Sequence, residues 1–176
     1  MLGLRAEDIG SQWTAEARSP LEGLYLRHAP RAMRLAYLLT GERAGAEDLV
    51  QDAFIRVASK TSKLDNDAAF AGYLRKTIVN LHTSRMRRRK VERAYIAREA
   101  SRPTTDAVLP DIDIRNDMRR RLLALPPRQR AALVLRYYED LSEAEAAAIL
   151  RCSPGAVKSL TSRGVRALRA EMRGEA

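Results

Sequence analysis

Apolar residues recur every three or four positions through three long segments in the first half of this chain, and this spacing constrains the fold more than any other feature. It runs through residues 21–39, 44–59 and 68–92, and such spacing places the apolar side chains on one face of an α-helix. The composition agrees, because Ala, Leu, Arg and Glu dominate and aromatic residues make up only 5%, which disfavours strands. We therefore predict an all-α fold.

The apolar spacing fades after residue 93 and resumes near residue 116. Residues 94–115 contain Pro103, Pro110 and scattered acids with no sustained period, which is typical of a flexible linker. We predict two small helical domains, at residues 21–93 and 116–173, after an N-terminal extension at residues 1–20. At full extension a linker of this length reaches about 75 Å.

The formal net charge of +10 favours an anionic partner, nucleic acid before a membrane surface. Cys152 is the only cysteine and His28 and His82 are the only histidines, so we expect no disulfide, no zinc site and no cofactor. There is no apolar run as long as a membrane span, and we place the chain in the cytoplasm. The chain lacks a glycine-rich phosphate loop or a nucleophile and base pair, and we expect that it is not an enzyme.

The most specific local pattern begins at Ser142, which with Glu145 forms a capping box that opens a short helix to Leu150. Ser153 and Pro154 then predict the start of another helix. Together they have the spacing of a helix-turn-helix, in which the second helix enters the major groove of DNA. The alternative is an ordinary helical hairpin with a solvated basic face. The second helix presents one polar face, formed by Lys158, Ser159, Ser162, Arg163 and Arg166.

Three further features carry weaker signals. The basic run at residues 85–93 either neutralises phosphates or is a solvated helix end. Phe70 and Tyr73 either stack on an extruded base or belong to the core. The acidic edge formed by Asp48, Gln51 and Asp52 either pairs with a basic partner helix or is solvated.

Taken in order, these segments resemble the extracytoplasmic-function (ECF) sigma factors of bacterial RNA polymerase, in the sigma-70 superfamily. The segment GAEDLVQDAFIRV at residues 45–57 resembles their polymerase-binding helix, and FAGYLRKTIVN at residues 70–80 resembles their promoter-melting helix. The segment LPPRQRAALVLRYYEDLS at residues 125–142 resembles their second domain, which carries the helix-turn-helix. The two predicted domains would then be sigma region 2 and sigma region 4.

The resemblance implies a sigma factor that binds core RNA polymerase, recognises a promoter and melts DNA, while the polymerase does the chemistry. The implied partners are the polymerase clamp helices and flap, promoter DNA and, as a possible addition, an anti-sigma factor. The implied polymerase contacts are Asp48, Gln51, Asp52, Leu133 and Tyr137. The implied −10 DNA contacts are Leu64, Asp65, Asn66, Asp67, Phe70, Tyr73, Lys76, Asn80, Arg85, Arg87 and Arg88. The implied −35 DNA contacts are Ser153, Lys158, Ser159, Ser162, Arg163 and Arg166.

A stand-alone helix-turn-helix regulator is the main alternative. Such a protein binds duplex DNA without polymerase and usually forms a symmetric dimer. An RNA-binding adaptor ranks lower, because the sequence lacks the stacking platform and glycine-bearing clamp of the common RNA-binding modules.

Overall fold

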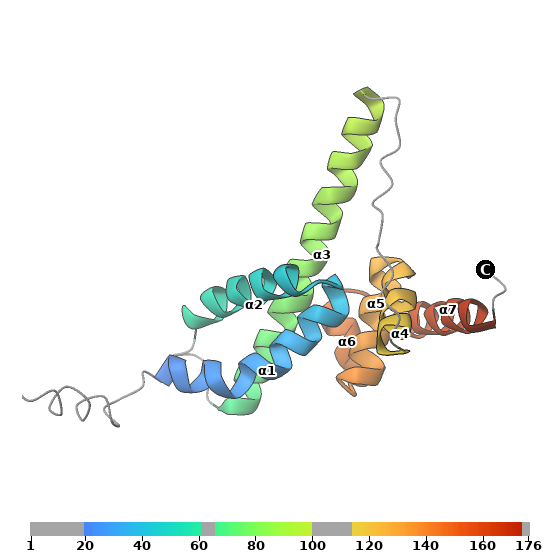
Figure 1. Ribbon diagram of the computed structural model, residues 1–176. Coiled ribbons are helices and arrows are strands. Elements are labelled where there is room, and N and C mark those ends of the chain that lie inside the picture. The colour runs from blue at the N-terminus through green and yellow to red at the C-terminus, as the bar shows by residue number, and fades with distance from the viewer. Residues whose placement is uncertain (1–19, 61–65, 100–113, 174–176) are drawn as a thin grey trace, which may run out of the picture.

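The computed structural model describes residues 20–60, 66–99 and 114–173, and every regular element in these ranges is helical (Figure 1). This confirms the all-α prediction. The expectations for the N-terminal extension, for residues 100–113 of the linker and for Leu64 and Asp65 lie outside the described residues. Within the described ranges, no helix is both long and apolar enough to cross a bilayer.

The first group of helices consists of α1 (Pro20–Thr40), α2 (Arg43–Ala58) and α3 (Asp67–Glu99). Helix α1 ends at Gly41, whose φ of +83° is readily adopted only by glycine. All three helices contribute their predicted apolar faces to one core. Its largest fully buried side chains include Leu35, Leu39, Leu49, Phe70 and Ile78.

Helix α3 is longer than the sequence pattern predicts. It continues to Glu99 and projects beyond the rest of the molecule (Figure 1), so residues 94–99 are helical where we expected linker. The apolar spacing fades there because the projecting end of the helix has no core to cover, and Val91 is 66% exposed. Between Glu99 and Ile114 the chain can then span at most about 50 Å, less than the 75 Å first expected.

The second group consists of α4 (Ile114–Ala124), α5 (Pro127–Leu133), the π-helical turn η2 (Val134–Tyr138), α6 (Glu143–Leu150) and α7 (Pro154–Arg173). The stretch from Pro127 to Tyr138 is not one regular helix, because its last part is the wider π turn. There the amide of Glu139 donates to the carbonyl of Val134 at 3.0 Å. An inserted residue of this kind has no signature in apolar spacing and is often found at functional sites.

Gly164 lets α7 pack closely on α5. A Cβ atom at this position would lie 2.7 Å from Cδ1 of Leu133, and Leu133 is itself buried. Replacing Gly164 with valine is expected to lower the unfolding free energy by about 2 kcal/mol, the usual cost of overpacking a core. Chemical denaturation followed by circular dichroism measures this change.

Gly155 provides the matched control for that substitution, because a Cβ there meets no atom within 4 Å. Gly155→Val is expected to leave the unfolding free energy within about 0.5 kcal/mol of the original value. Equal losses in the two variants would mean that helix propensity, and not the contact with Leu133, determines the effect.

The two groups of helices pack against each other. The apolar cluster that begins in α1–α3 continues through Ala131, Val134 and Leu135 of the second group, and Figure 1 shows α4–α6 beside the lower part of α3 and α1. The prediction of two small helical domains is confirmed, and the structure adds a packing contact between them. Sequence periodicity gives the buried face of each helix but not which of the domains covers it.

His82 lies where the two groups meet and is 2% exposed. Burial, with Arg130, Arg85 and Arg89 nearby, lowers the pKa of His82 to about 4. Because the unfolded chain binds this proton more tightly, the unfolding free energy is expected to decrease as the pH falls from 6.5 to 4, by roughly 3 kcal/mol.

Denaturation at pH 7, 5.5 and 4 measures that decrease. The variant His82→Leu should lack the part of the decrease that comes from protonation of His82. The acids Asp67, Asp117 and Glu145, whose pKa values are lowered by hydrogen bonds, add a further loss at lower pH in both proteins. Identical pH profiles for the two proteins would contradict the assignment to His82.

Candidate nucleic-acid interfaces

Helix α2 carries the acidic edge that the sequence indicated. Asp48 and Gln51 are exposed and Asp52 is half-exposed, and their three-and-four spacing puts them on one face. Oδ2 of Asp52 accepts a hydrogen bond from Arg85 of α3 at 2.6 Å, so part of this charge is matched within the chain. The same face contains Ile55, which is 64% exposed. The sequence reading omitted Ile55, although its position three residues after Asp52 placed it there.

The start of α3 is built by local hydrogen bonds. Oδ1 of Asn66 accepts from the amide of Ala69 at 2.8 Å, and this is the bond of a helix N-cap. Oδ1 of Asp67 accepts from His28 at 3.0 Å and from Arg27 at 3.1 Å. The hydrogen bond from His28 is the main cause of the lowered pKa of Asp67. Asn66 thus caps α3, and Asp67 holds the start of α3 against α1.

Phe70 is buried in this structure. It is 1% exposed, and its ring lies 6.1 Å from that of Phe54 and 5.0 Å from that of His28. Phe70 is part of the first core in this structure, and a DNA contact at Phe70 stays a prediction. Tyr73, one turn further on, is only half-buried, and Nζ of Lys60 lies 5.4 Å from its ring centre.

Four of the expected −10 contacts line one hollow of about 560 Å³ between α2 and α3. These are Tyr73, Asn80, Arg85 and Arg88. Lys76 and Arg87 are exposed on α3 outside it. The hollow is also lined by Arg56 of α2, by Lys60 in the turn that follows α2, and by Arg151 of the second group. Sequence reasoning missed these three residues because they come from separate parts of the chain. The basic residues at and just after the end of α2 were the one feature of the sequence that could have indicated two of them.

The helix-turn-helix is formed as the sequence predicts. Oγ of Ser142 accepts from the amide of Glu145 at 3.2 Å, and the amide of Ser142 donates to the Glu145 carboxylate at 2.7 Å. Arg151 closes α6 with a φ of +52°. Oγ of Ser153 accepts from the amide of Ala156 at 3.2 Å and caps α7. Both helices of the motif are therefore fixed by their caps.

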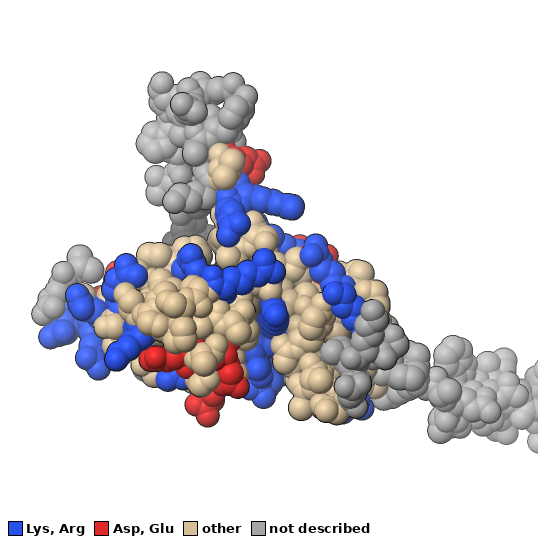
Figure 2. All heavy atoms as spheres, turned by 180° about the vertical axis from the view of Figure 1, so that it is seen from behind, with Lys and Arg blue, Asp and Glu red and all other residues tan. Residues whose placement is uncertain are grey.

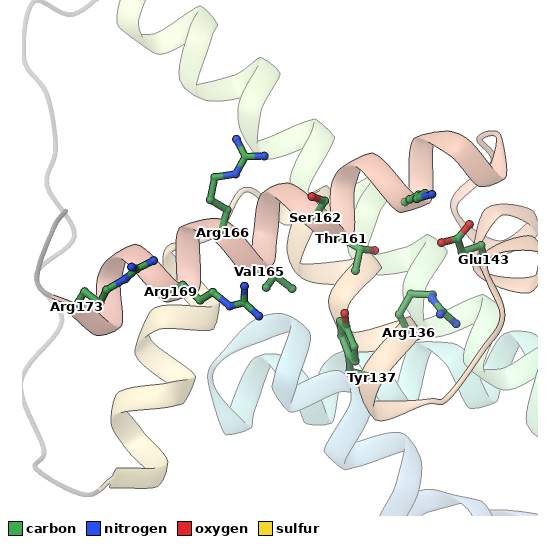
Figure 3. A pocket seen from close by; sticks show the side chains of 10 residues that line it. Arg136, Tyr137, Glu143, Thr161, Ser162, Val165, Arg166, Arg169 and Arg173 are labelled. Carbon is green, nitrogen blue, oxygen red and sulfur yellow. The ribbon is translucent and has the colours of Figure 1, made fainter.

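The polar face of α7 is exposed along its whole predicted length. Lys158, Ser162 and Arg166 border a hollow of about 400 Å³ beneath the helix. Tyr137 of η2 points toward Thr161 from below with Arg136 beside it, and Arg169 and Arg173 extend the basic lining along α7 (Figure 3). The sequence reading missed Arg136, Arg169 and Arg173, although the last two continue the spacing of Arg166.

Ser159 and Arg163 lie on the other flank of α7, where Nε of Arg163 donates to the carbonyl of Ser159 at 3.3 Å. Seen from behind, basic side chains are spread over this part of the molecule and over the base of the projecting α3, and acidic side chains form a separate patch (Figure 2).

The two expected polymerase contacts of the second group differ in accessibility. Tyr137 is 69% exposed. Leu133 is 5% exposed and fills the space beside Gly164, so a contact of its side chain with polymerase is ruled out in this structure. The helical spacing of Leu133 already fitted a core position.

A helical protein with a capped helix-turn-helix and an exposed basic face on its second helix has the features of a DNA-binding protein. Two comparisons identify its class. The family described as Sigma-70 region 2 matches residues 24–92, and the family described as Sigma-70, region 4 matches residues 115–168.

Among curated proteins, the ECF RNA polymerase sigma factor SigW of Bacillus subtilis is 31% identical over 153 residues, which cover 80% of this chain and 82% of SigW. The RNA polymerase sigma-E factor of Streptomyces coelicolor is 33% identical over 140 residues, with coverage of 80% and 78%. Among solved structures, the sigma factor RpoE of Bartonella quintana, in complex with the anti-sigma factor NepR, is 26% identical. It aligns with a TM-score of 0.68 over 88% of this chain and 98% of RpoE.

This chain belongs to the ECF sigma factors of the sigma-70 family. Its two groups of helices correspond to sigma regions 2 and 4, and its function is that of a sigma factor in transcription initiation. The alternative of a stand-alone regulator is not favoured, because the match to Sigma-70 region 2 covers residues 24–92 and the curated relatives are sigma factors.

Proposed function

We propose that the chain binds core RNA polymerase through the acidic edge of α2 and directs it to a promoter through α3 and α7. The observation that carries this proposal is the exposure of the side chains that it uses: Asp48 and Gln51 are exposed on α2, and the expected basic DNA contacts Lys158, Arg163 and Arg166 are exposed on α7. A basic pair of helices on polymerase is complementary to the acidic edge of α2. DNA phosphates are complementary to the basic side chains of α3 and α7.

The hollow between α2 and α3 is suited to single-stranded DNA of the −10 element. Arg85, Arg88 and Lys60 supply positive charge, Tyr73 supplies an aromatic ring, and Asn80 supplies a polar side chain. This combination of a basic groove and a stacking ring is typical of single-strand binding sites. Melting would then select promoters whose −10 sequence fits the hollow.

The face of α7 is suited to the major groove of the −35 element. Lys158 and Ser159 lie in the first turns, where recognition helices contact base edges. Arg166, Arg169 and Arg136 line the adjacent hollow and are placed to contact phosphates. Tyr137 adds an exposed aromatic side chain that a polymerase flap could cover.

In this proposal the chain is a non-catalytic subunit that acts in the cytoplasm, where polymerase meets DNA. Its partners are core RNA polymerase and promoter DNA. The Bartonella quintana relative is held by an anti-sigma factor, and we propose that this chain, too, is controlled by a protein that binds it before polymerase does.

Transcription of genomic DNA fragments by purified polymerase, with and without the chain, tests the proposal. Sequencing of the transcript ends should reveal start sites that depend on the chain and share two upstream motifs about two helical turns apart. Start sites without a shared motif pair, or none that depend on the chain, would contradict it.

A further inference from the structure

Glu139 lies at the centre of the contact between the two groups of helices. Its side chain is 1% exposed, and its Oε2 accepts hydrogen bonds from Arg31 of α1 at 2.9 Å and from Arg75 of α3 at 2.7 Å. We name these three residues the Glu139 cluster. Glu139 belongs to region 4 and both arginines belong to region 2, so the cluster joins the two regions. A carboxylate buried this deeply is stable only when it is paired in this way.

A second set of contacts joins region 4 to the C-terminal end of α1. The last turn of α1 contains no basic residue, although its carbonyl groups attract positive charge. Region 4 supplies it: Arg130 donates to the carbonyl of Leu39 at 2.8 Å, and Arg119 donates to the carbonyl of Gly41 at 3.0 Å. Burial lowers the pKa of Arg130, which marks its charge as partly removed from water.

One apolar and one polar interaction complete the contact between the two regions. Leu123 of α4 lies so close against Gly41 that a Cβ atom on the glycine would overlap the leucine side chain. Arg34 of α1 donates to the hydroxyl of Tyr138 at 3.0 Å. The contact thus combines charged, polar and apolar groups, and it is built from residues that the proposed polymerase and DNA surfaces do not use.

The closed arrangement brings the two proposed DNA surfaces close together. Arg151 of region 4 lines the same hollow as Asn80 and Arg88 of region 2. Lys158 follows Arg151 by seven residues, so the Cα atoms of the two would lie within about 25 Å of each other even if that segment were fully extended. Two promoter elements two helical turns apart on duplex DNA are about 70 Å apart. The closed chain therefore cannot occupy both elements at once.

We propose that the free chain is held in a closed state by the Glu139 cluster, and that this cluster must separate before regions 2 and 4 can engage one promoter together. The second part rests on the proposed function. The segment between Glu99 and Ile114 permits the separation, because it can reach about 50 Å when extended. If only the open chain binds, the apparent affinity for the promoter equals the affinity of the open chain multiplied by the fraction of chains that are open.

Distances between two spin labels in the free chain test the closed state. In a Cys152→Ser background, labels at Glu47→Cys on α2 and Glu171→Cys on α7 occupy exposed positions in the two regions. The unaltered cluster should give one narrow distance distribution. Glu139→Arg should give a broad one that extends at least about 20 Å further, within the reach of the connecting segment.

Charge exchange separates opening from unfolding. Arg75→Glu should open the chain from the other side, and the double variant Arg75→Glu with Glu139→Arg should restore the narrow distribution, which an unfolded region could not do. Asp140→Asn is the matched control, because Asp140 is the exposed neighbour of Glu139 and already has a φ of +53°, which asparagine tolerates. A broad distribution in the unaltered chain, or a narrow one in Glu139→Arg, would overturn the proposal.

Transcription at a promoter found by the mapping described above tests the consequence. When the chain is present in limiting amount, Glu139→Arg and Arg75→Glu should both raise the transcript yield. The gain would be up to about tenfold if the closed state is favoured over the open state by about ten to one. The two substitutions change the net charge in opposite directions, so a shared gain cannot come from charge alone. Unchanged or reduced yield in both variants would refute the second part of the proposal. If distances respond but no chain-dependent promoter exists, the proposed function fails and the closed state stands.

Discussion

Replacing Asp48 and Asp52 with lysine is expected to weaken binding to core RNA polymerase by about a hundredfold or more. Both carboxylates lie on the acidic edge of α2, and reversing charges that face a basic partner costs several kcal/mol at a desolvated contact. A lysine in place of Asp52 would also repel Arg85, which now bonds to the aspartate. Titration of labelled chain with purified core polymerase measures the dissociation constant.

Glu47→Lys is the matched control for this prediction. Glu47 precedes Asp48 in sequence and is also exposed, but it pairs with Arg43 at 2.7 Å and lies about 100° around the helix from Asp48. We expect its substitution to change polymerase affinity less than about threefold. Asp48→Lys alone should retain most of the effect, because this variant leaves the bond between Asp52 and Arg85 in place. Equal losses from Glu47 and Asp48 would show that net charge, and not the acidic edge, governs binding.

Replacing Lys158 and Arg163 with alanine is expected to weaken binding to promoter DNA about a hundredfold while sparing polymerase affinity. Both side chains are exposed on α7, and each good contact to a base edge accounts for about 1 to 3 kcal/mol of discrimination. Binding of the holoenzyme to promoter fragments, with intact and scrambled −35 sequences, measures the loss. The difference between the two fragments should shrink in the variant.

The control for α7 removes two arginines that lie elsewhere. Arg43 and Arg120 are exposed and pair with neighbouring acids on their own helices. Their replacement with alanine lowers the net charge by the same amount, and we expect a DNA affinity within about threefold of the original. If this control loses as much discrimination as the α7 variant, the −35 element is not read by α7.

Much of the fold could be predicted because the relevant signals are local. The capping box at Ser142 and the cap at Ser153 each depend on a few adjacent residues, and the structure confirms them.

The parts that could not be predicted depend on contacts between distant segments. Sequence spacing puts Phe70 on an apolar face but does not indicate whether the core or a DNA base fills the space around it. Leu133 fits a docking surface and a core position equally well until Gly164 is known to lie against it. The pairing of Glu139 with Arg31 and Arg75 joins residues 108 and 64 positions apart, and no local pattern indicates it.

Capture of core RNA polymerase by the purified chain tests the central claim most directly. The tagged chain is incubated with purified core enzyme in moderate salt, with nuclease present to remove bridging DNA, and the complex is resolved by size-exclusion chromatography. We expect one chain per core enzyme, with capture lost in the Asp48→Lys variant. No capture, together with tight and symmetric binding of the chain alone to duplex DNA, would contradict the account and favour a stand-alone regulator.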